Sequence, residues 1–306
     1  QSHHSVVLAK LFYDEGYSVI IQGSHFQWEF VKSMPDNYVP GVPAEDAQHL
    51  KNVTTKIVNQ LEHKYNCKLG DKTVIGTSFG ALTTLFLADN EYHNNTLNIT
   101  KYISICPPID LLYAMKQIDK NGEDRHKNTD NLQQRVAQTA SKIVQLSDLK
   151  NEKSNLNINK LPFTEDEGKL ITGFIMHQKL YDVIFTLANT PKTKQTNIYT
   201  KINNMNYKDY VEKYLLSKYS LEDFGEKVSL LSLEDFFRNN NNYKIYHSLD
   251  DYLTNQSQLK KLKIYTGQNT TILSNGSHLG FLYTKEFLND LKNEIKLTDK
   301  TALNRN

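Results

Sequence analysis

The first 110 residues change repeatedly between helical and strand-like patterns of apolar and polar positions. Apolar residues recur at helical spacing in three segments, and short runs rich in β-branched residues lie between them. A run of four to eight such residues bounded by turn signals is typical of a buried strand. We therefore predict helices at 6–15, 44–65 and 81–89, and strands at 17–23, 72–77 and 101–108.

Helices that alternate with strands in this way indicate an α/β fold, in which helices cover a mostly parallel sheet. Between about residues 111 and 242 the strand pattern disappears, and helical segments are joined by Asn-rich stretches. The earlier pattern returns with strands at 243–248 and 270–276 and helices at 253–263 and 284–295. We thus expect an α/β core formed by residues 1–110 and 243–306, interrupted by a helical cap or lid at 111–242.

The net charge and the distribution of basic residues bear on which classes of binding partner are expected. The 306 residues carry a net charge of only +2, and their basic residues are scattered. This gives no electrostatic argument for nucleic acid or an anionic membrane as a partner. The most apolar long segment, 169–188, contains His177, Lys179 and Asp182, so we predict no transmembrane helix and a soluble protein. Nothing in the composition selects a compartment or an oligomeric state.

The two cysteines are not expected to form a disulfide. Cys67 precedes the predicted strand 72–77, whereas Cys106 ends the strand that follows it along the chain. Such positions lie toward opposite edges of a parallel sheet, and a disulfide needs two Cα atoms within about 7 Å. The adjacent His3 and His4 are interpreted as solvated residues rather than as metal ligands, and we expect no metal site.

The segment Gly76-Thr77-Ser78-Phe79-Gly80 joins a predicted strand to a predicted helix. This is the setting of a nucleophile elbow, a sharp turn that presents a serine hydroxyl above a sheet. The helix N-terminus beside it could stabilise an oxyanion, with the amide of Phe79 as one donor. The alternative is a glycine-flanked turn with a passive serine.

A serine nucleophile needs a base, and the base needs a carboxylate that orients it. His278 lies in the loop "NGSHLGF", just past the last predicted strand and so on the same edge of the sheet as Ser78. Asp251 follows the preceding strand on that edge and is our choice for the acid. Its neighbour Asp250 is the second choice for the acid, and Asp110, which follows an earlier strand, is a third and more distant candidate.

The order Ser78, Asp251, His278 resembles that of the α/β-hydrolase fold superfamily. The resemblance covers residues 6 to about 295 and depends on the segments "DEGYSVIIQGS", "VIGTSFGALTTLFLA", "YHSLDDYLT" and "NGSHLGF". It implies a cofactor-free acyl transfer through an acyl-enzyme, and it implies strands before the first helix that are missing here. In that family a loop after those strands gives a second oxyanion amide, so either the sequence is a fragment of something longer or a backbone amide near Gln1 or Ser2 takes that role.

We therefore expect a serine hydrolase that cleaves a small-molecule carboxylic ester or thioester, with a mild preference for a lipid-like acyl group. Phe26 and Trp28 follow a predicted strand and either line an acyl pocket or anchor their loop to the core. Two alternatives stay open. One is a catalytically silent α/β-hydrolase scaffold that binds a small molecule or a partner protein, and the other is an acyltransferase that uses the same triad.

Overall fold

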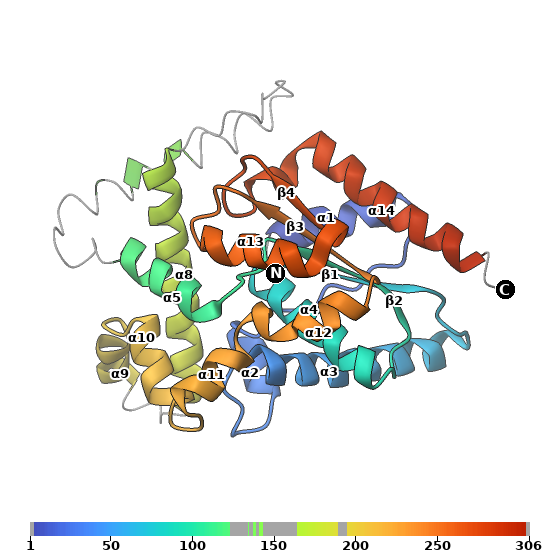
Figure 1. Ribbon diagram of the computed structural model, residues 1–306. Coiled ribbons are helices and arrows are strands. Elements are labelled where there is room, and N and C mark those ends of the chain that lie inside the picture. The colour runs from blue at the N-terminus through green and yellow to red at the C-terminus, as the bar shows by residue number, and fades with distance from the viewer. Residues whose placement is uncertain are drawn as a thin grey trace. The chain divides into compact units, whose positions relative to one another are not determined.

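The computed structural model describes residues 3–122, 134, 137–138, 141–142, 164–188 and 195–303 (Figure 1). The chain divides into two compact units, each formed by segments that are distant in sequence. The first unit comprises Gln1–His25, Tyr38–Tyr113 and Lys218–Asn306. The second comprises Phe26–Asn37 and Ala114–Ser217. It includes a short segment outside the expected insertion at 111–242, and residues 218–242 of that insertion belong to the first unit.

The first unit contains a four-stranded, all-parallel sheet with the strand order β1-β2-β3-β4. Because neighbouring strands run in the same direction, their carboxyl ends meet at one edge, where ligands of open α/β sheets usually bind. The strands are β1 (Lys72–Thr77), β2 (Ile99–Ile105), β3 (Tyr243–Ser248) and β4 (Thr270–Leu273).

Helices cover both faces of this sheet (Figure 1). The α-helices of the first unit are α1 (His3–Asp14), α3 (Pro43–Tyr65), α4 (Phe79–His93), α11 (Leu221–Lys227), α12 (Glu234–Asn239), α13 (Gln256–Thr266) and α14 (Lys285–Leu303). Single 3-10 turns lie at η3 (Leu230–Leu233), η4 (Gly267–Asn269) and η5 (Gly280–Tyr283).

One face of the sheet packs against α1 and α14, the first and last helices of the chain. Leu8 and Phe12 of α1 and Phe287, Leu291 and Ile295 of α14 are all buried in one hydrophobic cluster with residues of β2 and β3. On the other face α4 packs against β1 and β2, and α3 packs against α4. Residues 81–88 of α4 are all buried, in keeping with the mostly apolar sequence of that part of the helix.

Capping explains where α3 begins and ends. Pro43 occupies its first position, where the missing amide hydrogen costs nothing, and Glu45 and Asp46 lie in its first turn. Asn66 ends it in a left-handed conformation with φ of 48°. Asparagine tolerates this conformation better than most residues, so the polypeptide turns sharply there toward β1.

The second unit is helical in its described residues. A polar contact connects three of its helices, since the Asp119 carboxylate accepts hydrogen bonds from Nε2 of His177 and from the backbone amides of Tyr207 and Lys208. The helices are α2 (Trp28–Ser33), α5 (Leu111–Gly122), which begins in the first unit, α8 (Glu165–Leu187), α9 (Gln195–Ile202), α10 (Tyr207–Tyr210) and the π-helix η2 (Val211–Leu215).

The predicted strands at 72–77 and 243–248 are confirmed residue for residue as β1 and β3. The predicted strands at 101–108 and 270–276 correspond to β2 and β4, each of which ends earlier than expected. The helical character expected for residues 111–242 holds within the described part of that segment, and its stretches 123–133, 143–163 and 189–194 lie outside the described residues.

The predicted buried strand at 17–23 is wrong. Those residues pair with no strand of the described chain, and the side chains of Val19 and Ile20 are 38% and 47% exposed. A β-branched sequence favours an extended backbone, but a strand also needs a hydrogen-bonded neighbour. Strand β1 is an edge of the sheet, and 17–23 does not extend the sheet beyond it.

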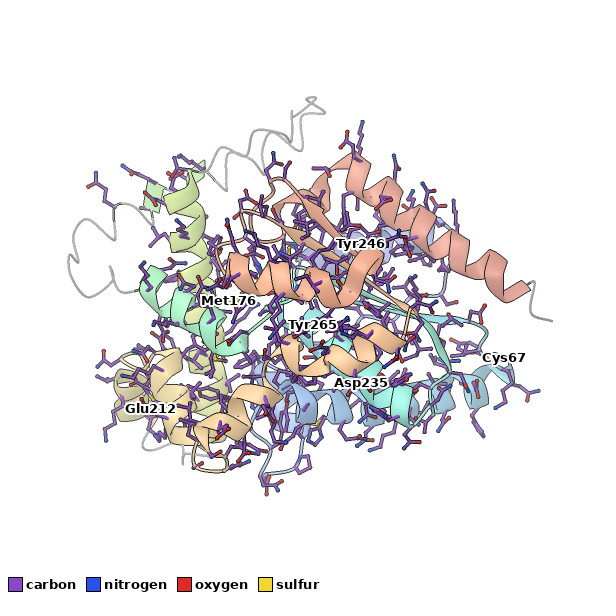
Figure 2. The ribbon with its side chains drawn as sticks, viewed as in Figure 1. Cys67, Met176, Glu212, Asp235, Tyr246 and Tyr265 are labelled. Atoms are coloured by element: carbon purple, nitrogen blue, oxygen red, sulfur yellow. The ribbon has the colours of Figure 1, made fainter. Side chains whose placement is uncertain are left out.

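Both cysteines are free. Cys67 is exposed at the end of α3 (Figure 2), and Cys106 is buried directly after β2. A shallow groove of about 460 Å³ lies around Cys67, at the amino end of the strands and therefore away from the edge that carries Ser78. Among the described residues, no helix combines the length and apolar character that crossing a membrane would require.

Candidate active site

Ser78 lies between β1 and α4 in a conformation that L-residues rarely adopt, with φ of 53° and ψ of −124°. Such strain persists only where the surrounding structure holds it. Here the amide of Ser78 donates a hydrogen bond of 2.9 Å to the carbonyl oxygen of Ile105 at the end of β2. The turn is therefore attached to the neighbouring strand, and it presents the serine at the N-terminus of a helix.

The two glycines of the turn have different roles. A Cβ atom on Gly76 would lie 2.3 Å from the carbonyl oxygen of Gly80 and 2.4 Å from Oγ1 of Thr84. Only glycine therefore allows α4 to approach β1 this closely. A Cβ atom on Gly80 would meet no atom within 4 Å. The motif thus needs its first glycine for packing and does not need the second one for that purpose.

His278 lies in the loop that follows β4. Its Nε2 atom is 2.8 Å from the Ser78 hydroxyl oxygen, although the two residues are 200 positions apart in sequence. Three neighbours of the histidine have positive φ angles: Gly276 at 130°, Ser277 at 50° and Leu279 at 69°. The loop is thus held in an unusual conformation that brings the imidazole to the serine.

Asp251 completes the chain of hydrogen bonds. Its Oδ2 atom is 2.9 Å from Nδ1 of His278, and its Oδ1 atom accepts the amide of Leu253 at 2.9 Å. The residue is only 4% exposed. Burial acts to raise the pKa of this carboxyl, but the adjacent His278 and the hydrogen bonds outweigh burial and lower the pKa below its usual value. Asp251 is therefore a carboxylate at neutral pH.

The charge on Asp251 determines where the proton of the imidazole lies. A carboxylate only accepts hydrogen bonds, so Nδ1 of His278 carries the proton in this pair. The Nε2 atom of a neutral imidazole then has a free electron pair directed at the Ser78 hydroxyl. This arrangement can take a proton from the serine, which is the chemistry of general-base activation.

Cys106 and His247 lie beneath the carboxylate, and their potential ligand atoms and that of Asp251 are all within 4.8 Å of one another. His247 accepts the amide of Ser248 at Nδ1 and hydrogen-bonds the Pro107 carbonyl through Nε2, so it is already paired. Burial lowers its pKa, which keeps it neutral. His247 is therefore a hydrogen-bonded core residue.

Burial, followed by the charge of Asp251, raises the pKa of the Cys106 thiol, so this thiol stays protonated and hydrogen-bonds to the carboxylate. A metal at this position would have to displace these hydrogen bonds and the one from His278. Cys106 therefore hydrogen-bonds to the acid and His247 is bound to backbone groups, so the three side chains are not a set of uncommitted metal ligands.

The other two candidate acids do not contact the imidazole. Asp110 directly precedes α5, and its side chain accepts the amide of Tyr113 and the side-chain amide of Gln258. Asp250 accepts the backbone amides of Ser277 and Gly276, so it touches the histidine loop but not the ring. Of the three carboxylates considered, the structure brings Asp251 to His278.

Phe79 is the first residue of α4, and the amides of a first helical turn point out of the helix N-terminus. Its role as an oxyanion donor stays a prediction. Gln1 and Ser2, which we considered for a second donor, lie outside the described residues. The helix that follows them lies near the histidine loop, because Nδ1 of His3 and Nδ1 of His4 are 3.1 and 2.5 Å from the hydroxyl oxygen of Tyr283.

A buried polar pair lies beside Phe79. The imidazole of His25 packs edge-on against the ring of Phe79 and donates a hydrogen bond to the backbone carbonyl of Asp46. Burial lowers the pKa of His25 to about 4 and raises the pKa of the Asp46 carboxyl to about 7, although Tyr38 and Gly41 bind that carboxyl. From its sequence position His25 is either a structural residue or a polar group of a pocket, and its contact with Phe79 arises only in the folded chain.

Phe26 and Trp28 belong to the second unit. Phe26 is buried, and its ring lies about 6 Å from those of Tyr207 and Tyr210. Trp28 begins α2, is 47% exposed, and has the ammonium group of Lys32 5.9 Å from its ring. Contact with a substrate stays a prediction for both residues.

In comparisons with known proteins, no family model, no curated protein and no solved structure matched this chain. Any assignment of function therefore depends on the geometry and chemistry of the site itself.

Proposed function

We propose that the protein is a serine hydrolase of the α/β-hydrolase type, which cleaves a carboxylic ester or thioester through an acyl-enzyme. The observation that carries the proposal is the chain of hydrogen bonds from the Ser78 hydroxyl to His278, at 2.8 Å, and from His278 to Asp251, at 2.9 Å. The strained conformation of Ser78 at a helix N-terminus supports it, because a structural turn alone does not need that strain.

In this mechanism the Ser78 oxygen attacks the acyl carbonyl carbon while its proton moves to Nε2 of His278. The imidazolium that forms is stabilised by the Asp251 carboxylate, and the amide of Phe79 donates to the oxyanion. Collapse of the tetrahedral intermediate breaks the bond to the leaving group, which takes the proton from His278. Water then attacks the acyl-enzyme while one of its protons moves to Nε2 of His278. The second tetrahedral intermediate releases the carboxylic acid as the acyl–serine bond breaks, and the Ser78 oxygen takes the proton back from His278.

A fluorophosphonate probe tests the proposal without knowledge of the natural substrate, because it reacts with activated serines. We expect the folded protein to gain the mass of one adduct, and peptide mapping to locate that adduct at Ser78. The S78A and H278A variants should not be labelled. The matched control H63A replaces an exposed histidine of α3 and should be labelled at the wild-type rate.

A wild-type protein that is folded by circular dichroism yet gains no adduct at Ser78 would contradict the hydrolase proposal. It would favour instead a silent scaffold that uses the same fold for binding. Labelling at another serine with Ser78 unmodified would have the same meaning, because the proposal assigns the reaction to this hydroxyl alone.

A further inference from the structure

Asp250, the neighbour of the proposed acid, holds the same loop as Asp251 but by a different part. Its Oδ1 atom accepts the amide of Ser277 at 2.8 Å, and its Oδ2 atom accepts the amide of Gly276 at 3.3 Å. The Ser248 hydroxyl, at the end of β3, donates to Oδ1 as well. Two consecutive carboxylates therefore contact one loop, Asp251 through the ring of His278 and Asp250 through the backbone that precedes it.

The backbone held by Asp250 is the part of the loop most in need of support. Ser277 has φ of 50° and Leu279 has φ of 69°, so the residues on both sides of His278 are in the left-handed region. L-residues other than Asn and Asp populate that region sparsely. A loop with two such residues around one histidine keeps its shape only while contacts outweigh the strain.

The far side of the loop has its own attachment. The amide of Gly280 bonds to the carbonyl of Gly276 at 2.8 Å, and the side chain of Phe281 is buried with its ring 4.9 Å from that of Phe287. These contacts fix the chain after His278. The Gly280 bond and the Phe281 side chain also touch Gly276, which precedes His278. Among the described hydrogen bonds, those from a side chain to the backbone before His278 are the ones that Asp250 accepts from Gly276 and Ser277.

We propose that Asp250 is a positioning residue for the reaction of Ser78. By binding the amides of Gly276 and Ser277, it keeps the strained loop in the one conformation that directs His278 toward the serine. This inference rests on the proposed function, and it assigns different roles to the two adjacent carboxylates. Asp251 orients the imidazole ring, and Asp250 sets the backbone that carries the ring.

The test compares the rates at which the fluorophosphonate probe labels Ser78 in D250A, D250N and the wild type. A misplacement of about 1 Å at a reacting group costs on the order of 100-fold in rate. We therefore expect D250A to be labelled about 10- to 100-fold more slowly. D250N should recover much of the rate, because its amide oxygen still accepts the amide of Ser277. The control D71A removes an exposed aspartate that precedes the amino end of β1 and should react as the wild type does.

A role in stability alone would lower the melting temperature of D250A and leave the labelling rate of the folded protein unchanged. That result would overturn the proposal. If D250A does not fold, D250S gives the same comparison, because its short hydroxyl does not reach both amides. Equal slowing of D250N and D250A would also overturn it, since the carboxylate charge, and not the hold on the loop, would then be the cause.

A second measurement separates this inference from the proposed function. The proton on Nδ1 of His278 should be visible by NMR while the imidazole is held against Asp251. We expect that resonance in the wild type and in D250N, and its loss through exchange with water in D250A. If the wild type is not labelled by the probe but the resonance behaves in this way, the hydrolase proposal fails and the positioning role stands. If D250A keeps the wild-type resonance, the positioning role fails whatever the labelling shows.

Discussion

The unequal roles of the two glycines in the turn give a quantitative prediction. In the G76A variant the new Cβ atom would lie 2.3 Å from the carbonyl oxygen of Gly80, whereas ordinary contact begins at 3.4 Å. The shortfall is 3.4 − 2.3 = 1.1 Å. Rotation of the Thr84 side chain relieves one clash, but the oxygen of Gly80 belongs to the backbone of α4. The helix and the strand must therefore separate by about 1 Å.

The cost follows from overpacking. Extra atoms in a closely packed region typically destabilise a protein by about 1–3 kcal/mol, and more where backbone must move. G80A is the matched control, because its Cβ atom meets nothing within 4 Å and alanine favours a helix over glycine by about 1 kcal/mol. We therefore expect G76A to lose about 1–3 kcal/mol of unfolding free energy and G80A to gain about 0.5–1 kcal/mol.

Urea unfolding followed by circular dichroism measures both differences, and the fluorophosphonate probe reports on the turn itself. Displacement of Ser78 by about 1 Å should slow its labelling on the order of 100-fold in G76A. An ordinary surface substitution changes the unfolding free energy by at most about 0.5 kcal/mol. If the unfolding free energy of G76A differs from that of the wild type by no more than this, or if both alanine variants lose equal amounts, the close approach of strand and helix is not what requires the glycine.

Two further predictions concern the turn and its neighbours. Glycine accepts the backbone angles of Ser78 and alanine does not, so S78G should be more stable than S78A by about 1 kcal/mol in urea titrations, and equal stability would contradict the strain. His25 stays neutral in the folded protein down to about pH 4, but in the unfolded chain it gains a proton below its usual pKa of 6.5. Its contribution to stability is thus lost as the pH falls from 6.5 toward 4, and between about pH 7 and about pH 5 the wild type should lose about 2 kcal/mol more than H25Q. Parallel pH dependence in the two proteins would refute this assignment.

The sequence was sufficient to predict those elements whose pattern of residues is complete within one short segment. Strands β1 and β3 are β-branched or aromatic runs bounded by turn residues, and both were predicted to the residue. The convergence of Ser78, Asp251 and His278 was predictable because each follows a strand of a parallel sheet, and the carboxyl ends of such strands share one edge. Topology, rather than any local feature, brings the three side chains together.

What escaped prediction depends on contacts between distant segments. Residues 17–23 carry a strand-like pattern but pair with no described strand, and pairing does not show in a single segment. Asp250 and Asp251 are chemically identical neighbours, so only the turn that follows β3 decides which one faces the ring. The shifted pKa values of His25 and Asp46 follow from burial. Neither residue lies in an apolar stretch of sequence from which that burial could be predicted.

The separation of Ser78 from its base by 200 residues has a consequence for biosynthesis. At about 5–20 residues per second, the ribosome needs about 10–40 s to make the chain between them. During that interval Ser78 has no imidazole to take its proton, so the nascent chain should not react with acyl compounds. Strand β2 must also wait for β3 before the sheet can grow, which leaves the backbone amide and carbonyl groups of its free edge unpaired while translation continues.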